Sequence, residues 1–121
     1  MLQGIRGATA VETDQPEAIL QATRELLDKV MKANPSLRTT DIASAIFTVT
    51  PDIHSAYPAR AAREFGWERV PMLCAQEIPV PGGLPFCIRV LVHWNTNLPS
   101  EAVQHVYLHQ AASLRPDLAS G

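Results

Sequence analysis

The stretch CAQEIPVPGGLPFCIRVLVHWNT, residues 74–96, holds the pattern that decides the fold. Alternation over residues 86–95 predicts a strand, one face of which carries the apolar side chains Phe86, Ile88, Val90, Val92 and Trp94. Arg89 falls on the opposite face, and a charge that cannot be neutralised is costly to bury without a negative partner. The apolar face is therefore predicted to pack in a core, and the face with Arg89 is predicted to contact a negatively charged partner or ligand. The nearest upstream carboxylate is that of Glu77.

Four more strands and one long helix are predicted around this strand. β-branched, apolar and small residues predict strands over residues 5–11, 45–50, 70–76 and 106–114. Apolar residues at helical spacing predict an amphipathic helix that follows Asp14 as its N-cap, has Pro16 in its first turn and ends at Asn34. The fold class is therefore α+β, with five strands packed on one long helix.

Short helical turns and an uncovered sheet face complete the prediction. Pro58 suits the first turn of a short helix through Phe65, with Gly66 as its stop, and further turns are expected near residues 40 and 100. One long helix cannot cover both faces of a five-stranded sheet. The uncovered face would mix Arg6 and Arg89 with apolar residues, so we expect it to be covered by other copies of the chain.

The composition fits one globular domain over residues 1–121, with a loose tail after about residue 117. The 121 residues are 46% hydrophobic, and the formal net charge of −2 argues against a nucleic-acid partner. No apolar run reaches the ~18 residues of a membrane span or resembles a signal peptide, so we expect a cytoplasmic protein with no membrane partner. Two cysteines without a Cys-x-x-Cys pair do not predict a disulfide scaffold.

Arginines outnumber lysines by eight to two. Arginine suits fixed, bidentate contacts with carboxylates or phosphates, although a coding bias would give the same ratio. One interpretation is a convergent pocket for a ligand with more than one carboxylate, built from Arg6, Arg60, Arg63, Arg89 and Arg115. The alternative is a set of ion pairs between subunits, with Glu12, Glu64, Glu77 or Asp117 as partners.

The sequence offers no obvious reactive group. Cys74 has no histidine nearby in sequence to activate it, which favours a half-buried structural thiol. His105 and His109 have metal-ligand spacing only on a helix, and no acidic third ligand accompanies them. We therefore expect no metal and no cofactor, and an enzyme with this inventory would act by orientation and electrostatics.

Several blocks resemble the small trimeric chorismate mutases of the α+β type, which differ from the all-helical mutases. These blocks are GIRGATAVE (4–12), PDIHSAYPARAAREFGW (51–67), CAQE (74–77), GG (82–83), CIRV (87–90), HVYL (105–108) and LRPDL (114–118). The resemblance covers nearly the whole chain in order. It implies a mixed sheet, a homotrimer shaped as a pseudo-barrel with sites between subunits, and rearrangement of chorismate to prephenate on the route to phenylalanine and tyrosine.

The resemblance also implies a set of site residues. Carried over by position, the substrate-binding residues are Arg6, Tyr57, Ala59, Arg60, Arg63, Leu73, Cys74, Glu77, Arg89, Tyr107, Leu114 and Arg115. Among them, Arg89 would meet charge on the breaking ether oxygen, and Arg6 and Tyr107 would hold the enolpyruvyl side chain. Glu77 and Cys74 would bind the ring hydroxyl. Arg60 stands where the family often has lysine, and Tyr57 where phenylalanine is common.

Two points stay open at this stage. Cys74 and Glu77 are three residues apart, so a regular strand would point them to opposite faces. Either the strand ends or bulges before Glu77, or the two residues serve different pockets across a subunit interface. The rival functions are a trimeric enamine or imine deaminase, which also holds a substrate carboxylate with an interface arginine, and a non-catalytic carboxylate sensor.

Overall fold

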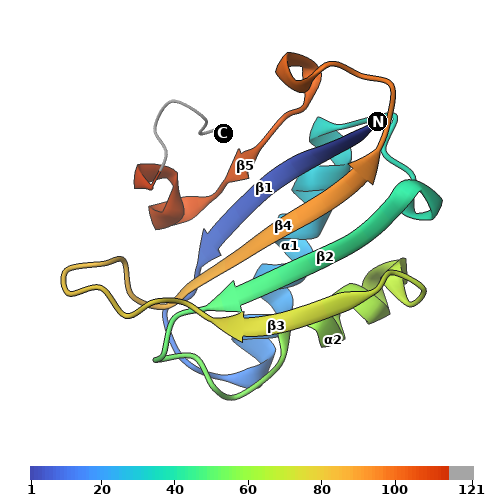
Figure 1. Cartoon of the computed structure of the whole chain (residues 1–121). Helices are drawn as coiled ribbons and strands as arrows, with labels where there is room; N and C mark the ends of the chain where they lie inside the picture. The colour runs from blue at the N-terminus through green and yellow to red at the C-terminus, as the bar shows by residue number, and fades with distance from the viewer. Residues whose placement is uncertain (115–121) are drawn as a thin grey trace.

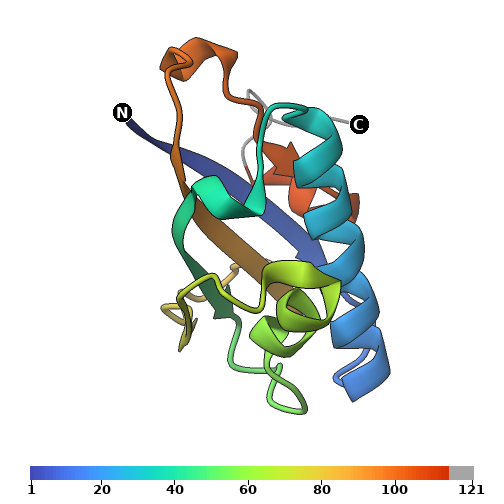
Figure 2. The same cartoon turned by 90° about the vertical axis from the view of Figure 1, so that its right-hand side faces the viewer.

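The computed structural model describes residues 1–114, which form a sheet with helices packed on one side (Figures 1 and 2). The strands are β1 (Leu2–Ala10), β2 (Ile42–Val49), β3 (Met72–Gln76), β4 (Cys87–Asn95) and β5 (Val106–Tyr107). The helices are α1 (Pro16–Ala33) and α2 (Pro58–Ala62), and short 3-10 turns lie at Thr39–Asp41, Ser100–Ala102 and His109–Ser113. The predicted α+β class is confirmed. None of the helices in residues 1–114 is long and apolar enough to cross a bilayer.

The strand order is β3-β2-β4-β1-β5, so the strand from the opening stretch is at the centre of the sheet (Figure 1). Strand β4 pairs antiparallel with both β1 and β2. The outer pairs, β2 with β3 and β1 with β5, are parallel. The sheet is therefore mixed, as the resemblance implied.

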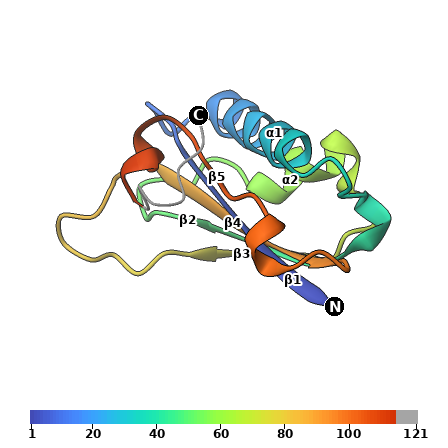
Figure 3. The same cartoon turned by 90° about the horizontal axis from the view of Figure 1, so that it is seen from above.

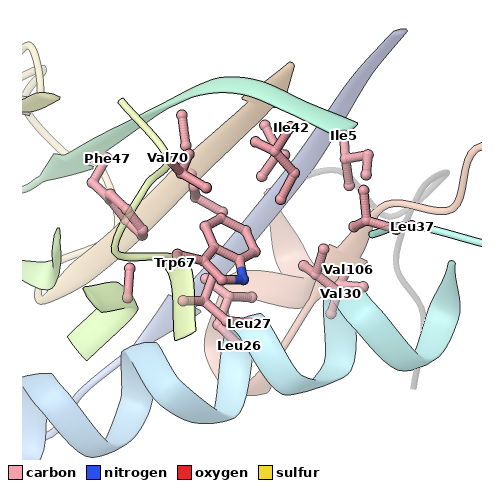
Figure 4. Close-up of a cluster of buried hydrophobic side chains, with 14 of the residues drawn as sticks. Ile5, Leu26, Leu27, Val30, Leu37, Ile42, Phe47, Trp67, Val70 and Val106 are labelled. Carbon is pink, nitrogen blue, oxygen red and sulfur yellow. The ribbon is translucent and has the colours of Figure 1, made fainter. Parts of the chain in front are cut away.

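Helices α1 and α2 both cover the same face of the sheet, and the core lies between them (Figures 2 and 3). Alternation directs Ile5, Phe47, Val90 and Trp94 to this face, and each is at most 3% exposed. Figure 4 shows Trp67, which follows α2, packed between the sheet and Leu26 and Leu27 of α1. Burial of these large side chains is the main stabilising contribution to the fold.

The opposite face of the sheet, which we call the open face, is not covered by α1 or α2 (Figure 3). At its β1–β5 end, Ala111 of the 3-10 segment His109–Ser113 packs against Ala8 and Tyr107. Strand pairing sets two rows of residues across the open face. One row is Leu73, Ile46, Leu91 and Arg6, and the next row is Ala75, Thr48, Arg89, Ala8 and Tyr107. The apolar members of the first row are 36–70% exposed.

The predicted fifth strand over residues 106–114 is wrong beyond Tyr107. After Leu108 donates its N–H to the carbonyl of Ala8, His109 takes a positive φ of 55° and the chain turns into the 3-10 segment. Because β1 ends at Ala10, it offers little further backbone for pairing. The predicted strand start at residue 70 is also wrong, since Val70 lies in a buried turn and β3 begins at Met72.

The predicted N-cap role of Asp14 is wrong as well. Helix α1 is capped at Gln15 without a side-chain hydrogen bond. The Oδ1 atom of Asp14 instead accepts the backbone N–H groups of His54 and Ser55, each at 3.0 Å. Asp14 therefore ties the start of α1 to the loop before α2. The short helix was predicted correctly in outline, and Gly66 adopts a φ of 112° where that helical segment is kinked.

Candidate active site

A groove of about 570 Å³ lies on the open face and extends across β2, β4, β1 and β5. It is lined by Arg6, Gly7, Ala8, Ile46, Thr48, Arg89, Val90, Leu91, Tyr107 and Leu114. Arg89 and Tyr107 belong to the same row across the sheet, with Ala8 between them. Ala8 is only 1% exposed because it packs against Tyr107 and Ala111, so the groove borders this small cluster.

The sheet register brings Arg6 and Arg89 together. Arg6 pairs with Leu91 and Ala8 pairs with Arg89, so the two arginines are diagonal neighbours on adjacent strands. The Cα atoms of such diagonal neighbours are about 7–8 Å apart in space, within reach of long side chains. Two guanidinium groups and one phenol therefore line one groove, and this arrangement can bind a carboxylate through bidentate hydrogen bonds.

On the edge of β1 that faces β5, the backbone of Arg6 is held by a side chain rather than by strand pairing. Its N–H donates to Nδ1 of His105 at 2.9 Å, just before the short pairing of β1 with β5 begins. This bond joins the two segments that carry Arg6 and Tyr107. The sequence suggests for His105 only the role of a metal ligand, and only on a helix. It does not lie on a helix, and residues 1–114 hold no cluster of metal-ligating side chains.

The start of β4 is also held firmly, which fixes the position of Arg89 two residues later. The Asp52 carboxylate accepts the N–H of Phe86 at 3.0 Å, and the Thr50 hydroxyl accepts the N–H of Cys87 at 2.9 Å. Both bonds come from the turn that follows β2. Arg89 is therefore carried by a central strand that is anchored at its first residue.

Glu77 lies beside Arg89 in the same chain. Its Oε2 atom is 3.8 Å from Nε of Arg89, which is a loose ion pair, and it accepts a 2.6 Å hydrogen bond from the Thr48 hydroxyl. Glu77 and Arg89 border a second hollow of about 530 Å³ beneath the loop that joins β3 to β4. Arg89 thus separates this hollow from the groove. Thr48 was not identified from the sequence, although the parity of β2 places its hydroxyl on the open face.

Tyr57 and Cys74 line a different pocket, of about 390 Å³, at the outer edge of the sheet. Strand β3 ends at Gln76, and Cys74 points toward the core side, where it is half-buried. Within one chain, then, Cys74 and Glu77 belong to different pockets. The end of β3 before Glu77 is what the first of the two explanations states, and the different pockets within one chain are compatible with the second, which remains a prediction about the subunit interface. Leu73 is 70% exposed on the open face, and Ala59 is buried in α2.

Arg60 and Arg63 are exposed and do not line the groove. The Nε–H of Arg60 donates to Glu64 at 3.2 Å, and the same carboxylate pairs with Arg24 of α1 at 3.4 Å. Arg60 therefore pairs with Glu64 within its own chain, whereas the alternative from the sequence predicts ion pairs between subunits. Arg115 lies outside the described residues.

The two cysteines are free and differ in environment. Cys87 is 1% exposed, and this burial raises the pKa of its thiol, an effect that the nearby charge of Arg89 only partly offsets. A buried thiol with a raised pKa is a poor nucleophile. Cys74 is half-buried, as expected from the sequence.

The fold and the groove define a small α+β protein with a groove on the open face of its sheet that is lined by two arginines and a tyrosine. Comparison with known proteins makes this assignment specific. The family model for chorismate mutase type I matches residues 2–118, and the chain belongs to this family.

The similarity extends over nearly the whole chain. Chorismate mutase AroH of Thermus thermophilus is 58% identical over 120 residues, which cover 99% of this chain and 98% of that protein. Chorismate mutase AroH of Bacillus subtilis (strain 168) is 46% identical, with 98% and 94% covered. The solved structure of a chorismate mutase from Clostridium thermocellum is 44% identical, with a TM-score of 0.88, and the match covers 91% of this chain and 97% of that one.

Proposed function

We propose that this protein converts chorismate into prephenate at the groove on its open face. The observation that carries the proposal is the convergence of Arg6, Arg89 and Tyr107 on one groove, in a chain that belongs to the chorismate mutase type I family. Chorismate carries two carboxylates, which match a site with paired guanidinium groups. The names of the two AroH relatives support the same activity.

The proposed mechanism is electrostatic. In this pericyclic rearrangement a C–O bond breaks while a C–C bond forms, and negative charge builds on the ether oxygen. Arg89 is placed to stabilise that charge, because its strand is anchored and its guanidinium lines the groove. Arg6 and Tyr107 hold the enolpyruvyl carboxylate and thereby fix the reactive conformation of the substrate. No step requires a cofactor, a metal or a covalent intermediate.

We further propose that the groove is half of a complete site. The other half consists of residues at the outer edge of the sheet in a neighbouring copy of the chain, with Tyr57, Ala59, Leu73 and Cys74 against the substrate and Arg60 and Arg63 at the mouth. The exposed apolar row on the open face supports this association, because a homotrimer would cover it. Leu114, which lines the groove, would contact the substrate, and Arg115 would help Arg60 and Arg63 attract the dianion. Glu77 would accept a hydrogen bond from the ring hydroxyl.

The cellular location is also part of the proposal. Both cysteines are unpaired, which suits the reducing cytoplasm, where the route to phenylalanine and tyrosine would use the product. The substrate and product would be the small-molecule partners of the site.

The direct test is loss of chorismate absorbance with identification of prephenate as the product. A deaminase or a carboxylate sensor would leave chorismate unchanged, so this assay separates the mutase from both rivals. Light scattering should give the mass of a trimer, and a stable, active monomer would contradict the shared site.

Mixed trimers test the shared site more sharply. Arg89→Ala removes the groove half, and Cys74→Tyr fills the edge pocket, so each variant alone should be inactive. A trimer that contains both chains would rebuild one intact site, and activity should return on mixing after co-refolding. No recovery, with trimers present by light scattering, would place the whole site within one chain.

A further inference from the structure

Thr48 lies between the two opposite charges of the site. It sits on β2 directly across from Arg89 on β4, and both side chains line the groove. Its hydroxyl donates to Oε2 of Glu77 at 2.6 Å, and this same oxygen lies 3.8 Å from Nε of Arg89. The same oxygen of Glu77 therefore interacts with both the Thr48 hydroxyl and the Arg89 guanidinium, and the hydroxyl is the closer of the two.

The closer contact restrains the carboxylate. The backbone N–H of Glu77 donates to the carbonyl of Val49 at 2.8 Å, so the main chain on which the side chain pivots is fixed. A short O–H···O⁻ bond is among the strong hydrogen bonds of proteins. Thr48 is β-branched and sits within a strand that is paired on both sides, so its own side chain has few alternative rotamers.

Without this restraint, Glu77 would have a better partner. An arginine and a carboxylate prefer a bidentate geometry with two N–H···O bonds of about 2.7–2.9 Å. At 3.8 Å, Arg89 and Glu77 do not form this bidentate pair. A movement of about 1 Å would bring them to the bonding distance. In a bidentate pair, the carboxylate would occupy the N–H groups of Arg89 and offset its positive charge.

We propose that Thr48 is a positioning residue, which holds Glu77 back from a bidentate ion pair and so keeps the guanidinium of Arg89 available to the substrate. This inference rests on the proposed role of Arg89 in the rearrangement. Thr48 acts through Glu77 and does not touch the reacting atoms. Its contribution should therefore appear in turnover, where the charge of Arg89 matters, more than in substrate binding.

The test uses Thr48→Val, which replaces the hydroxyl by a methyl group of similar size and keeps the β-branched shape suited to a strand. Turnover at saturating chorismate should fall by about 10-fold, which is less than the ~10²–10³-fold typical of deleting a preorganised donor. The Michaelis constant should change much less. Thr48→Ser, which keeps the hydroxyl, should restore most of the turnover.

Two controls separate positioning from a general structural role. Ser44 lies on the same face of β2, is bonded to His93 at 3.0 Å and does not line the groove, so Ser44→Ala should leave turnover unchanged. In a Glu77→Gln background, adding Thr48→Val should change turnover less than ~2-fold, because the group that Thr48 restrains has lost its charge. An equal loss in both backgrounds, or full turnover in Thr48→Val, would overturn the proposal.

A structural measurement keeps the inference independent of the activity. In a crystal structure of the Thr48→Val trimer, the distance from Nε of Arg89 to the nearest oxygen of Glu77 should shorten from 3.8 Å toward a direct bond. An unchanged distance would overturn the inference even if the wild-type protein rearranges chorismate. A shortened distance in a protein that leaves chorismate unchanged would instead refute the proposed function alone. Thr48→Ala serves as the second variant if the valine substitution lowers expression.

Discussion

The two faces of the sheet are built from the same strands and differ in almost every other respect. Ile88 and Val90 point into the helix-covered core and are at most 3% exposed, while Arg89 between them lines the groove on the open face. On β2, Phe47 is fully buried, and its neighbours Ile46 and Thr48 both line the groove. Strand alternation thus separates stability from chemistry by a single residue step. Substitutions one position apart should therefore have effects of different kinds.

The largest expected effect is on the core side. Phe47→Ala removes a fully buried aromatic ring from the cluster around Trp67, and such truncations cost about 3–5 kcal/mol of unfolding free energy. Ile46→Ala, one residue earlier on the open face, should cost clearly less. Denaturant unfolding at one fixed protein concentration compares the two variants, and equal losses would contradict the division between the faces.

Two glycines of β1 give a smaller, matched contrast. A Cβ at Gly7, which faces the core, would lie 3.0 Å from Val90 and 3.3 Å from Leu26, so Gly7→Ala should cost about 1–3 kcal/mol through overpacking. A Cβ at Gly4, on the open face, would meet Leu91 at an ordinary 3.5 Å, and Gly4→Ala should be tolerated. Thermal unfolding of both variants checks this, and a stabilised Gly7→Ala would show that the core can relax there.

These pairs also show what could be predicted from the sequence. Alternation alone assigned Arg6 and Arg89 to the uncovered face, because parity within a strand is a local property. It could not give the register, which is a long-range pairing, and so it could not show that Ala8 separates Arg89 from Tyr107. The role of Thr48 was missed for the same reason.

The failures at Asp14 and His109 have a related cause. Asp14 has the residue type and spacing of an N-cap, but a distant loop supplies better donors. The apolar run after Val106 looks like a strand, but its partner strand β1 ends after a few residues and the chain turns at His109. In both places tertiary contacts override a local preference. The assignment of individual site residues depended mainly on the family resemblance.

The two cysteines differ in burial and should therefore differ in reactivity. Burial raises the pKa of the Cys87 thiol, so this residue should react with a small alkylating reagent at least ~10-fold more slowly than half-buried Cys74. Mass spectrometry of native protein after timed alkylation at pH 8 gives the two rates. Faster labelling of Cys87 would mean that the start of β4 opens readily, against the anchored strand described above.

The smallest effect is expected at Asp14, away from both faces. Desolvation acts to raise the pKa of this carboxyl, but the N–H groups of His54 and Ser55, the Ser55 hydroxyl and the charge of His54 lower it more. A carboxyl with a lowered folded-state pKa stabilises the fold above its unfolded value, near 4, and this contribution is lost as the pH falls through the folded-state pKa. Asp14→Asn should therefore be less stable than wild type at pH 6, and the difference should shrink toward pH 3. If the stability difference between the variant and the wild type were the same at pH 6 and pH 3, the loss would come from hydrogen bonding and not from the charge of Asp14.

The central claim is that Arg89 stabilises charge that develops only in the transition state. If Arg89 only bound a carboxylate, a neutral replacement would raise the Michaelis constant and leave turnover unchanged. Arg89→Lys keeps the charge but loses the planar fork, and should therefore recover only part of the rate of the wild type.

The most direct measurement is turnover at saturating chorismate for a protein with citrulline at position 89, after light scattering has confirmed that it assembles like the wild type. Citrulline keeps the shape and most hydrogen bonds of arginine but removes the positive charge. Since removal of one preorganised donor already costs about 10²–10³-fold, turnover should fall by ~10²-fold or more, with a smaller change in the Michaelis constant. Turnover close to that of the wild type would make Arg89 a binding residue and would contradict the electrostatic mechanism.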